Sequence, residues 1–264
     1  MSPSIPLKFS ESMKTRTYAI CLLLVLCGYD RIFAVGKITG KVSFTGAIPK
    51  TEFFKCSADQ SICGKQQSLD RLVLGKDRGV ANTLVFIKNP PPASTLSMKP
   101  AVIVQDHCRF TPHMIIGAKG SSIQFINNDD VLHNCHGYYF NYTGAGLERT
   151  TAFNIAQPIT GQKNNQELRK QGMISLECDA GHTWMSAWIW VTANPYATVT
   201  NSDGEYSFNG LPAGKYTIVI WHEGWEVIST GSDGRPIFSA PVSKEVEITV
   251  SDNGVAAANF DLQK

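Results

Sequence analysis

The stretch Glu177-Cys178-Asp179-Ala180-Gly181-His182-Thr183-Trp184-Met185 joins two strand-like runs, residues 172–177 and 186–192. Within one short loop it places a thiol, an imidazole and a thioether. Cysteine and methionine are soft metal ligands, and histidine binds most first-row transition metals. A loop of this composition between two strands therefore predicts a metal site that is held by a β framework.

The ligand types indicate copper. Two histidines and a cysteine in a trigonal plane, with a weak methionine on the axis, form the ligand set of mononuclear blue-copper sites. The loop supplies Cys178, His182 and Met185, so the second histidine has to come from elsewhere. His133 follows the turn Asn127-Asn128-Asp129-Asp130 and begins a strand-like run, which makes it our first choice.

The remaining sequence is typical of an all-β protein. Helical periodicity is scarce, whereas Gly, Pro and Asp-Gly turn signals are frequent. With 264 residues, of which 43% are hydrophobic, the chain can form one or two domains of about 100–150 residues. We expect a β-sandwich or Greek-key barrel from short strands at residues 101–105, 114–116, 122–127, 131–134, 150–155, 174–178 and 185–192.

Two local expectations concern this region. A polar stretch at residues 162–171 is compatible with a helix. On the closing strand, Trp188 and Trp190 alternate with Ala187 and Ile189, and the tryptophans are the pair that we expect to face the core.

The N-terminus predicts export. Lys8, Lys14 and Arg16 precede an uncharged, leucine-rich run at residues 18–29 that is too short to span a membrane. Residues 1–34 are therefore a predicted signal peptide, with cleavage after Ala34 and a lipoprotein site at Cys27 as the alternative. The mature protein would be periplasmic or extracellular, with no membrane span.

Removal of the leader leaves a neutral protein. The leader carries four basic and two acidic residues, so twenty of each remain in the rest of the chain. This balance does not favour a nucleic-acid partner.

An odd number of cysteines remains after removal of the leader. The five are Cys56, Cys63, Cys108, Cys135 and Cys178. If Cys178 binds metal, two disulfides can form from the other four, although a buried free thiol satisfies the same count. Our first choice of pair is Cys63 with Cys108, and the second is Cys56 with Cys135.

Residues 101–192 resemble the cupredoxin family. The resemblance rests on the His133-Asn134 segment and the Cys178 loop in that order, and on upstream residues Phe110-Thr111-Pro112, Gly120, Phe125 and Asn127. It implies a Greek-key β-sandwich that binds one copper ion through His133, Cys178 and His182, with Met185 as the axial ligand. It also implies that Asn134 ties the first-ligand strand to the cysteine loop by hydrogen bonds.

The loop spacing departs from that of small cupredoxins. They commonly have Cys-x2-His or Cys-x4-His, whereas this chain has Cys-x3-His-x2-Met. The spacing resembles the binuclear copper domain of cytochrome oxidase, but Ile174 stands where that site needs a second cysteine. We therefore expect a mononuclear, type 1-like centre.

Other residues compete for these roles. His113 and His136 are the main alternatives to His133, although each is more simply a hydrogen-bonded structural group. Met185 could instead fill the core. Trp184 lies between two predicted ligands, so an apolar, partly exposed surface near His182 and Trp184 is where we expect a redox partner protein to dock.

The flanking segments resemble a second family. An Asp203-Gly204 hairpin, followed by Leu211-Pro212 and Gly214, resembles transthyretin-like, carboxypeptidase-regulatory-type domains. The strand that opens such domains resembles residues 40–46. We therefore predict a discontinuous transthyretin-like β-sandwich, residues 36–88 with 196–264, into which a cupredoxin domain, residues 101–193, is inserted. Three consecutive units are the alternative.

In overall order the chain also resembles exported plastocyanin-like proteins, some of which are labelled methylamine-utilisation proteins; the match includes Trp221-His222-Glu223. The sequence predicts an exported electron carrier that cycles Cu(II)/Cu(I) and is not an enzyme, because a single type 1 site offers no open position for substrate. The alternatives are an exported copper carrier or storage protein, and a metal-free β-sandwich binding module.

Overall fold

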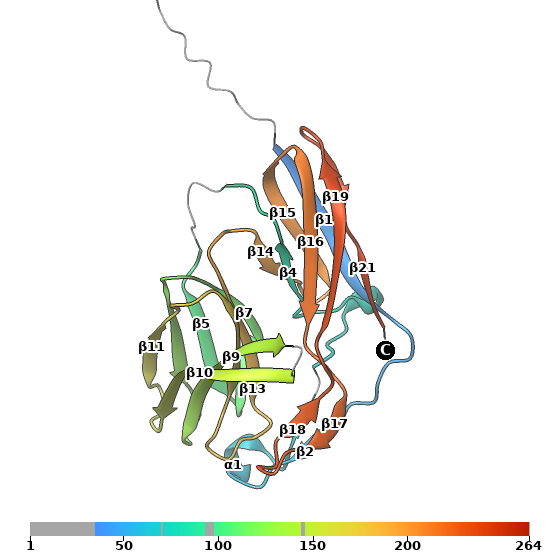
Figure 1. Cartoon of the computed structure of the whole chain (residues 1–264). Helices are drawn as coiled ribbons and strands as arrows, with labels where there is room; N and C mark the ends of the chain where they lie inside the picture. The colour runs from blue at the N-terminus through green and yellow to red at the C-terminus, as the bar shows by residue number, and fades with distance from the viewer. Residues whose placement is uncertain (1–34, 70, 93–97, 144–145, 264) are drawn as a thin grey trace, which may run out of the picture. The chain divides into compact units, whose positions relative to one another are not determined.

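The computed structural model describes residues 35–69, 71–92, 98–143 and 146–263. The predicted leader and its cleavage site lie outside these residues. The described part is almost entirely β, as the sequence predicts (Figure 1). Within it, no helix is long and apolar enough to cross a membrane.

The predicted metal-site region forms two sheets. The five-stranded sheet has the order β10 (Gly146–Gln157), β9 (His133–Thr143), β12 (Gly172–Glu177), β13 (Ser186–Thr192) and β7 (Met114–Ala118). The four-stranded sheet has the order β11 (Lys163–Glu167), β8 (Ser122–Asn127), β5 (Ala101–Asp106) and β6 (Arg109–Thr111).

Alternating apolar residues of these two sheets share one core. Ile103 and Phe125 from the four-stranded sheet, and Leu176 and Ile189 from the five-stranded sheet, are fully buried in the same cluster. Successive strand side chains point to opposite faces, so each strand contributes every second residue to this core. The two sheets therefore form a β-sandwich.

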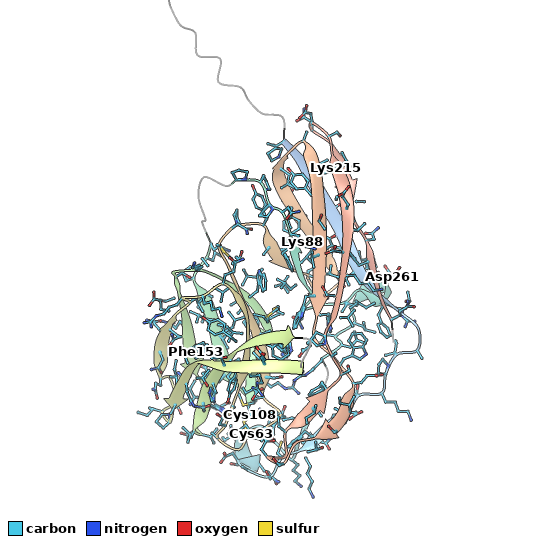
Figure 2. The ribbon with its side chains drawn as sticks, in the orientation of Figure 1. Cys63, Lys88, Cys108, Phe153, Lys215 and Asp261 are labelled. Atoms are coloured by element: carbon cyan, nitrogen blue, oxygen red, sulfur yellow. A yellow bond between two sulfur atoms is a disulfide. The ribbon has the colours of Figure 1, made fainter. Side chains whose placement is uncertain are left out.

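The flanking segments form two more sheets around a second core. One contains β15 (Glu205–Pro212), β1 (Val35–Thr45), β20 (Val255–Ala257) and β21 (Phe260–Gln263). The other has the order β14 (Ala197–Val199), β4 (Leu84–Ile87), β16 (Gly214–His222) and β19 (Val242–Val250). Figure 2 labels Lys88, Lys215 and Asp261 on this C-terminal β unit; its core includes Ile38, Phe208 and Ile218.

Strand β1 pairs with strands from the far end of the chain. Ile38 lies opposite Phe208 of β15 in antiparallel register, and Val42 lies beside Phe260 of β21 in parallel register. In Figure 1 the blue β1 accordingly runs among orange and red strands. The division into an inserted and a discontinuous domain, and the transthyretin-like identity, stay predictions.

Short elements complete the described chain. A small hairpin of β2 (Phe53–Lys55) and β3 (Gln66–Ser68) flanks helix α1 (Gln60–Cys63). A 3-10 turn, η1, spans Lys76–Arg78, and a second hairpin pairs β17 (Val227–Thr230) with β18 (Pro236–Phe238).

Two sequence expectations were wrong. The stretch compatible with a helix contains strand β11, whose polar side chains pair with β8 at the edge of a sheet. The tryptophans of β13 do not face the sandwich core, because Ala187 and Ile189 do. Trp188 packs on Trp221, with ring centroids 4.9 Å apart, and Trp190 stacks on Phe86 at 5.1 Å.

The reason is that β13 is buried on both faces. Its second face belongs to a separate apolar cluster that includes Leu84, Met114, Met173 and Trp188, together with partly buried Trp221. Alternation alone therefore could not tell which face of β13 belonged to which core.

A buried carboxylate connects the two β units. Glu223 is only 4% exposed and lies 2.8 Å from Arg71 Nη1. The indole Nε1–H of Trp188 donates to Glu223 Oε2 at 2.7 Å, and His113 Nε2 bonds Oε1. Burial by itself raises the pKa of Glu223, but Arg71 and His113 outweigh it and bring the pKa to about 2. The carboxylate is therefore charged and fully paired.

Glu223→Gln should destabilise the protein by about 3–5 kcal/mol at neutral pH, because Arg71 would be left buried without its counter-charge. The folded pKa of about 2 lies below the ordinary 4.5, so this stabilisation is present above pH 4.5 and is lost as the pH falls towards 2. Urea unfolding of wild type and variant should show a free-energy difference that shrinks across this window. A pH-independent difference would contradict the assignment.

Candidate metal centre

Strand ends bring the predicted ligands together. His133 is the first residue of β9, and Cys178 directly follows β12. These strands are antiparallel neighbours, with Glu177 opposite His136, so the start of one meets the end of the other. His182 lies in the loop, and Met185 precedes β13.

Three donor atoms converge in a buried pocket. His133 Nδ1 lies 3.2 Å from His182 Nδ1, and Cys178 Sγ lies 4.0 Å from the former and 3.7 Å from the latter. All three residues are fully buried. Imidazole nitrogen at about 2.0 Å and thiolate sulfur at about 2.3 Å from one ion are roughly 3.3–3.8 Å apart. The three residues therefore fit a single transition-metal ion.

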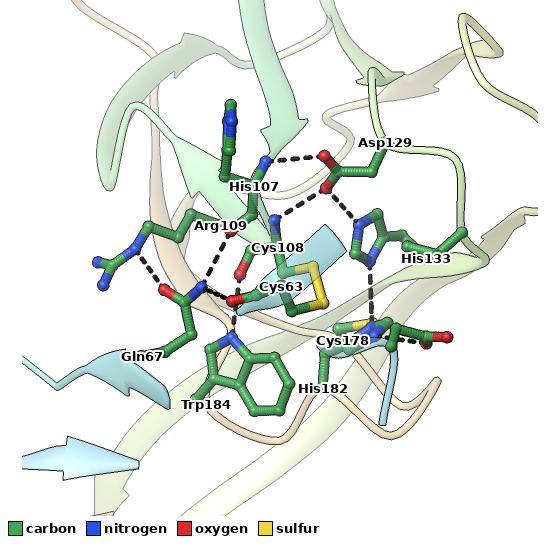
Figure 3. The surroundings of a disulfide bond; sticks show 12 residues. Cys63, Gln67, His107, Cys108, Arg109, Asp129, His133, Cys178, His182 and Trp184 are labelled. Atoms are coloured by element: carbon green, nitrogen blue, oxygen red, sulfur yellow. Dashed lines mark hydrogen bonds and ion pairs between the residues drawn. A yellow bond between two sulfur atoms is a disulfide. The ribbon is translucent and has the colours of Figure 1, made fainter. Parts of the chain in front are cut away.

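Two carboxylates fix which nitrogen each imidazole presents. His133 Nε2 is 2.7 Å from Asp129 Oδ2, and His182 Nε2 is 3.0 Å from Asp59 Oδ2; Figure 3 labels Asp129 above His133. A carboxylate accepts, so Nε2 carries the proton in each ring and Nδ1 keeps its lone pair. Two lone pairs that face each other at 3.2 Å repel unless a cation or a proton lies between them, which supports the metal assignment.

The environment keeps His133 neutral. Burial lowers its pKa, although the hydrogen bond with Asp129 acts in the opposite direction. A neutral imidazole is the form that binds metal, and a carboxylate on its other nitrogen increases its basicity as a ligand.

Backbone N–H groups point at the cysteine sulfur. The N–H of Asn134 donates to Cys178 Sγ at 3.3 Å, and that of Ala180 is a second donor. The Asn134 side chain accepts from the N–H of Asp179 at 3.3 Å, which confirms the predicted tie between the first-ligand strand and the loop. Burial raises the pKa of the Cys178 thiol, and these donors together with Arg235 oppose that rise by stabilising the thiolate.

Met185 lies in the same buried apolar cluster as Cys178 and Trp184. It is 1% exposed, and its N–H donates to the His182 carbonyl at 2.9 Å, which tightens the loop between the two residues. Its role as the fourth ligand stays a prediction.

The segment at residues 52–69, which we call the covering segment, closes the site. It is anchored by the Cys63–Cys108 disulfide, which confirms the first predicted pair. Figure 3 shows this disulfide beside His133 and Trp184. The second predicted pair is wrong, because Cys56 and Cys135 are free buried thiols; Cys135 lies on β9 and bonds Gln157 instead.

The covering segment also corrects an expectation about Trp184. This side chain is only 8% exposed, because it packs on Phe54 of β2 with ring centroids 5.4 Å apart. Its indole N–H donates to the Cys108 carbonyl at 3.0 Å. His182 is fully buried, so neither residue forms the exposed rim that the sequence suggested.

The competing histidines lie elsewhere. His113 bonds Glu223, and His136 bonds Asp179 Oδ2 at 2.5 Å and the hydroxyl of Tyr138 at 2.7 Å. Neither belongs to any of the groups of potential metal ligands found among the described residues.

Sequence reasoning missed the two carboxylates. Asp129 had a weak signal, because it lies four residues before His133 in a turn. Asp59 had none, since it comes from a polar loop more than a hundred positions away from His182. Asp59 is at the N-terminus of α1 in the left-handed region, φ 50°, and makes no side-chain bond to its own helix. The side chain is thereby free to reach the imidazole.

Comparison with known proteins gives limited information. No family model and no curated protein matches the sequence. A purple cupredoxin from Nitrosopumilus maritimus has 17% identity and a TM-score of 0.27 over 35% of this chain and 99% of its own. A reduced Cu(I) amicyanin mutant has 14% identity and a TM-score of 0.28 over 41% of this chain and 98% of its own.

A third solved structure is the Cu-containing nitrite reductase from Thermus scotoductus SA-01. It has 18% identity and a TM-score of 0.27 over 39% of this chain, which spans only 25% of the reductase chain. These likenesses are with cupredoxin structures and concern about two fifths of the chain. The transthyretin-like resemblance has no counterpart among the structures named here and stays a prediction.

Replacing Asp59 with Ala should weaken copper binding by about 10–100-fold, the usual cost of losing a partner that orients a ligating histidine. Asp77→Ala is the matched control, since Asp77 has the same φ of 50° but lies at an exposed turn. Competition with a copper chelator measures both affinities. Equal affinities of the two variants would show that Asp59 does not orient His182.

Proposed function

We propose that this chain is a mononuclear copper protein that carries single electrons by cycling the ion between Cu(II) and Cu(I). His133, Cys178 and His182 are the principal ligands and Met185 is the axial ligand. The observation that carries the proposal is the convergence of Cys178 Sγ with two Nδ1 atoms whose imidazoles already donate their Nε2 protons to carboxylates.

The donor set suits one-electron transfer. Copper bound there supplies a one-electron couple in which thiolate and thioether favour Cu(I) and imidazole serves both oxidation states. The protein holds these donors at the ends of paired strands, so the ligands move little when the charge changes. Four protein ligands leave no position for a substrate, and an electron carrier rather than an enzyme is the consequence.

Burial distinguishes this role from copper delivery. An ion that is handed to another protein needs ligands that can be reached by a competing donor, whereas an electron can pass through intervening protein. His133, Cys178 and His182 are all fully buried, which favours retention of the ion. A copper carrier would exchange metal with a chelator quickly, and a metal-free binding module would be purified without copper; exchange kinetics and metal analysis test these alternatives.

Export and partner belong to the same proposal. An exported electron carrier agrees with the leader at residues 1–34 and with the disulfide between Cys63 and Cys108. We place the docking surface for a redox partner on the covering segment, because it lies over His182 and Trp184.

Copper-loaded protein should show an intense visible band from thiolate-to-copper charge transfer, and Cys178→Ser should abolish it. Cys56→Ser is the control, because Cys56 is an equally buried free thiol outside the ligand group. Absorption spectroscopy with one equivalent of copper tests both. A colourless wild type that binds copper no better than Cys178→Ser would exclude the proposed centre.

A further inference from the structure

The ligand loop is gripped by a residue of the C-terminal β unit. Arg235 precedes β18 and is separated from Cys178 by more than fifty positions. Its Nη2 donates to the Cys178 carbonyl at 3.1 Å, and its Nη1 lies 3.3 Å from the Thr183 carbonyl. These two carbonyls flank His182, so one guanidinium spans the part of the loop that carries both a cysteine and a histidine ligand.

Arg235 also pairs with the acidic residues on either side of Cys178. Its Nε lies 3.3 Å from Glu177 Oε2, and its Nη2 lies 3.3 Å from Asp179 Oδ1. The side chain is 16% exposed, and Glu177, which also pairs with Arg149, is 15% exposed. Partial burial makes these contacts stronger than ordinary surface ion pairs.

The approach of Arg235 is itself fixed. The Arg235 N–H donates to Asp233 Oδ1 at 3.0 Å, and Gly234 turns the chain with a φ of 80°, which a residue with a side chain rarely adopts. The planar guanidinium can then donate to two carbonyls at once, which a lysine ammonium cannot reproduce with the same geometry.

We propose that Arg235 is a positioning residue of the copper centre, and that the C-terminal β unit is therefore an integral part of that centre. Arg235 holds the Cys178–Thr183 loop in its ligating conformation and offsets the charges of Glu177 and Asp179 beside the thiolate. This inference rests on the proposed function for its copper readouts, but its effect on the loop is a property of the metal-free protein as well.

The two roles have different consequences. Copper with a thiolate carries one more positive charge as Cu(II) than as Cu(I), so unpaired carboxylates nearby favour Cu(II). Loss of the guanidinium charge should therefore weaken Cu(I) binding more than Cu(II) binding. Loss of the two carbonyl contacts should instead loosen the loop whether or not copper is bound.

The experiment compares Arg235→Gln, Arg235→Lys and the control Arg169→Gln, whose guanidinium is exposed and pairs with Glu167. In Arg235→Gln, Cu(I) affinity measured by chelator competition should fall about tenfold relative to Cu(II) affinity. This corresponds to a fall of about 59 mV in the reduction potential. The visible band should persist, because every ligand is retained.

Hydrogen exchange of the metal-free proteins provides the independent readout. The amides of Asp179 and Met185, which bond Asn134 Oδ1 and the His182 carbonyl, should exchange faster in Arg235→Gln and Arg235→Lys than in wild type. Arg235→Lys keeps the charge, so its preference between Cu(I) and Cu(II) should stay near that of wild type. Arg169→Gln should match wild type in every measurement.

The outcomes separate the two proposals. Wild-type exchange rates in both Arg235 variants, with an unchanged copper preference in Arg235→Gln, would overturn the role of Arg235. A wild type that binds no copper would overturn the proposed function, while exchange would still decide whether Arg235 holds the loop. If Arg235→Gln does not fold, faster exchange of the loop amides in Arg235→Lys supports the inference and unchanged exchange overturns it.

Discussion

The candidate centre depends on two hydrogen bonds that end on carboxylates. Asp129 and Asp59 each accept from Nε2 of an imidazole, and as a result the opposite nitrogens of His133 and His182 meet at Cys178. If either ring turned over, a proton would point at the metal position and the donor set would be incomplete. The orientation of two rings therefore decides whether the pocket can hold an ion.

The two carboxylates are held by different parts of the fold. Asp129 is fixed locally, since its oxygens also accept from the N–H groups of His107 and Cys108 at 2.8 Å. Asp59 arrives with the covering segment, which the disulfide ties to Cys108. The disulfide thus acts on the site indirectly, because it limits how far Asp59 can move from His182.

The β unit that flanks the sandwich contributes in a similar way. Glu223 collects Arg71, His113 and the indole of Trp188, a strand residue four positions after the ligand loop ends at Trp184. Arg235 contacts the ligand loop directly. A strand with both faces buried and a loop bound from outside lose much of their freedom to move, which is what a site for electron transfer requires.

The sequence by itself determined the all-β class, the convergence of His133 with the Cys178 loop, the tie through Asn134 and the Cys63–Cys108 pair. These follow from local patterns: alternation along strands, turn residues, and ligand types concentrated in one loop. It did not determine the pairing of Cys56, the strand at residues 163–167, the face of Trp188 or the burial of Trp184. Nor did it indicate Asp59 and Arg235 as neighbours of the ligands. Only the tertiary structure decided these, because each depends on which distant segment packs against a given face, and no local spacing encodes a contact between residues so far apart in the chain.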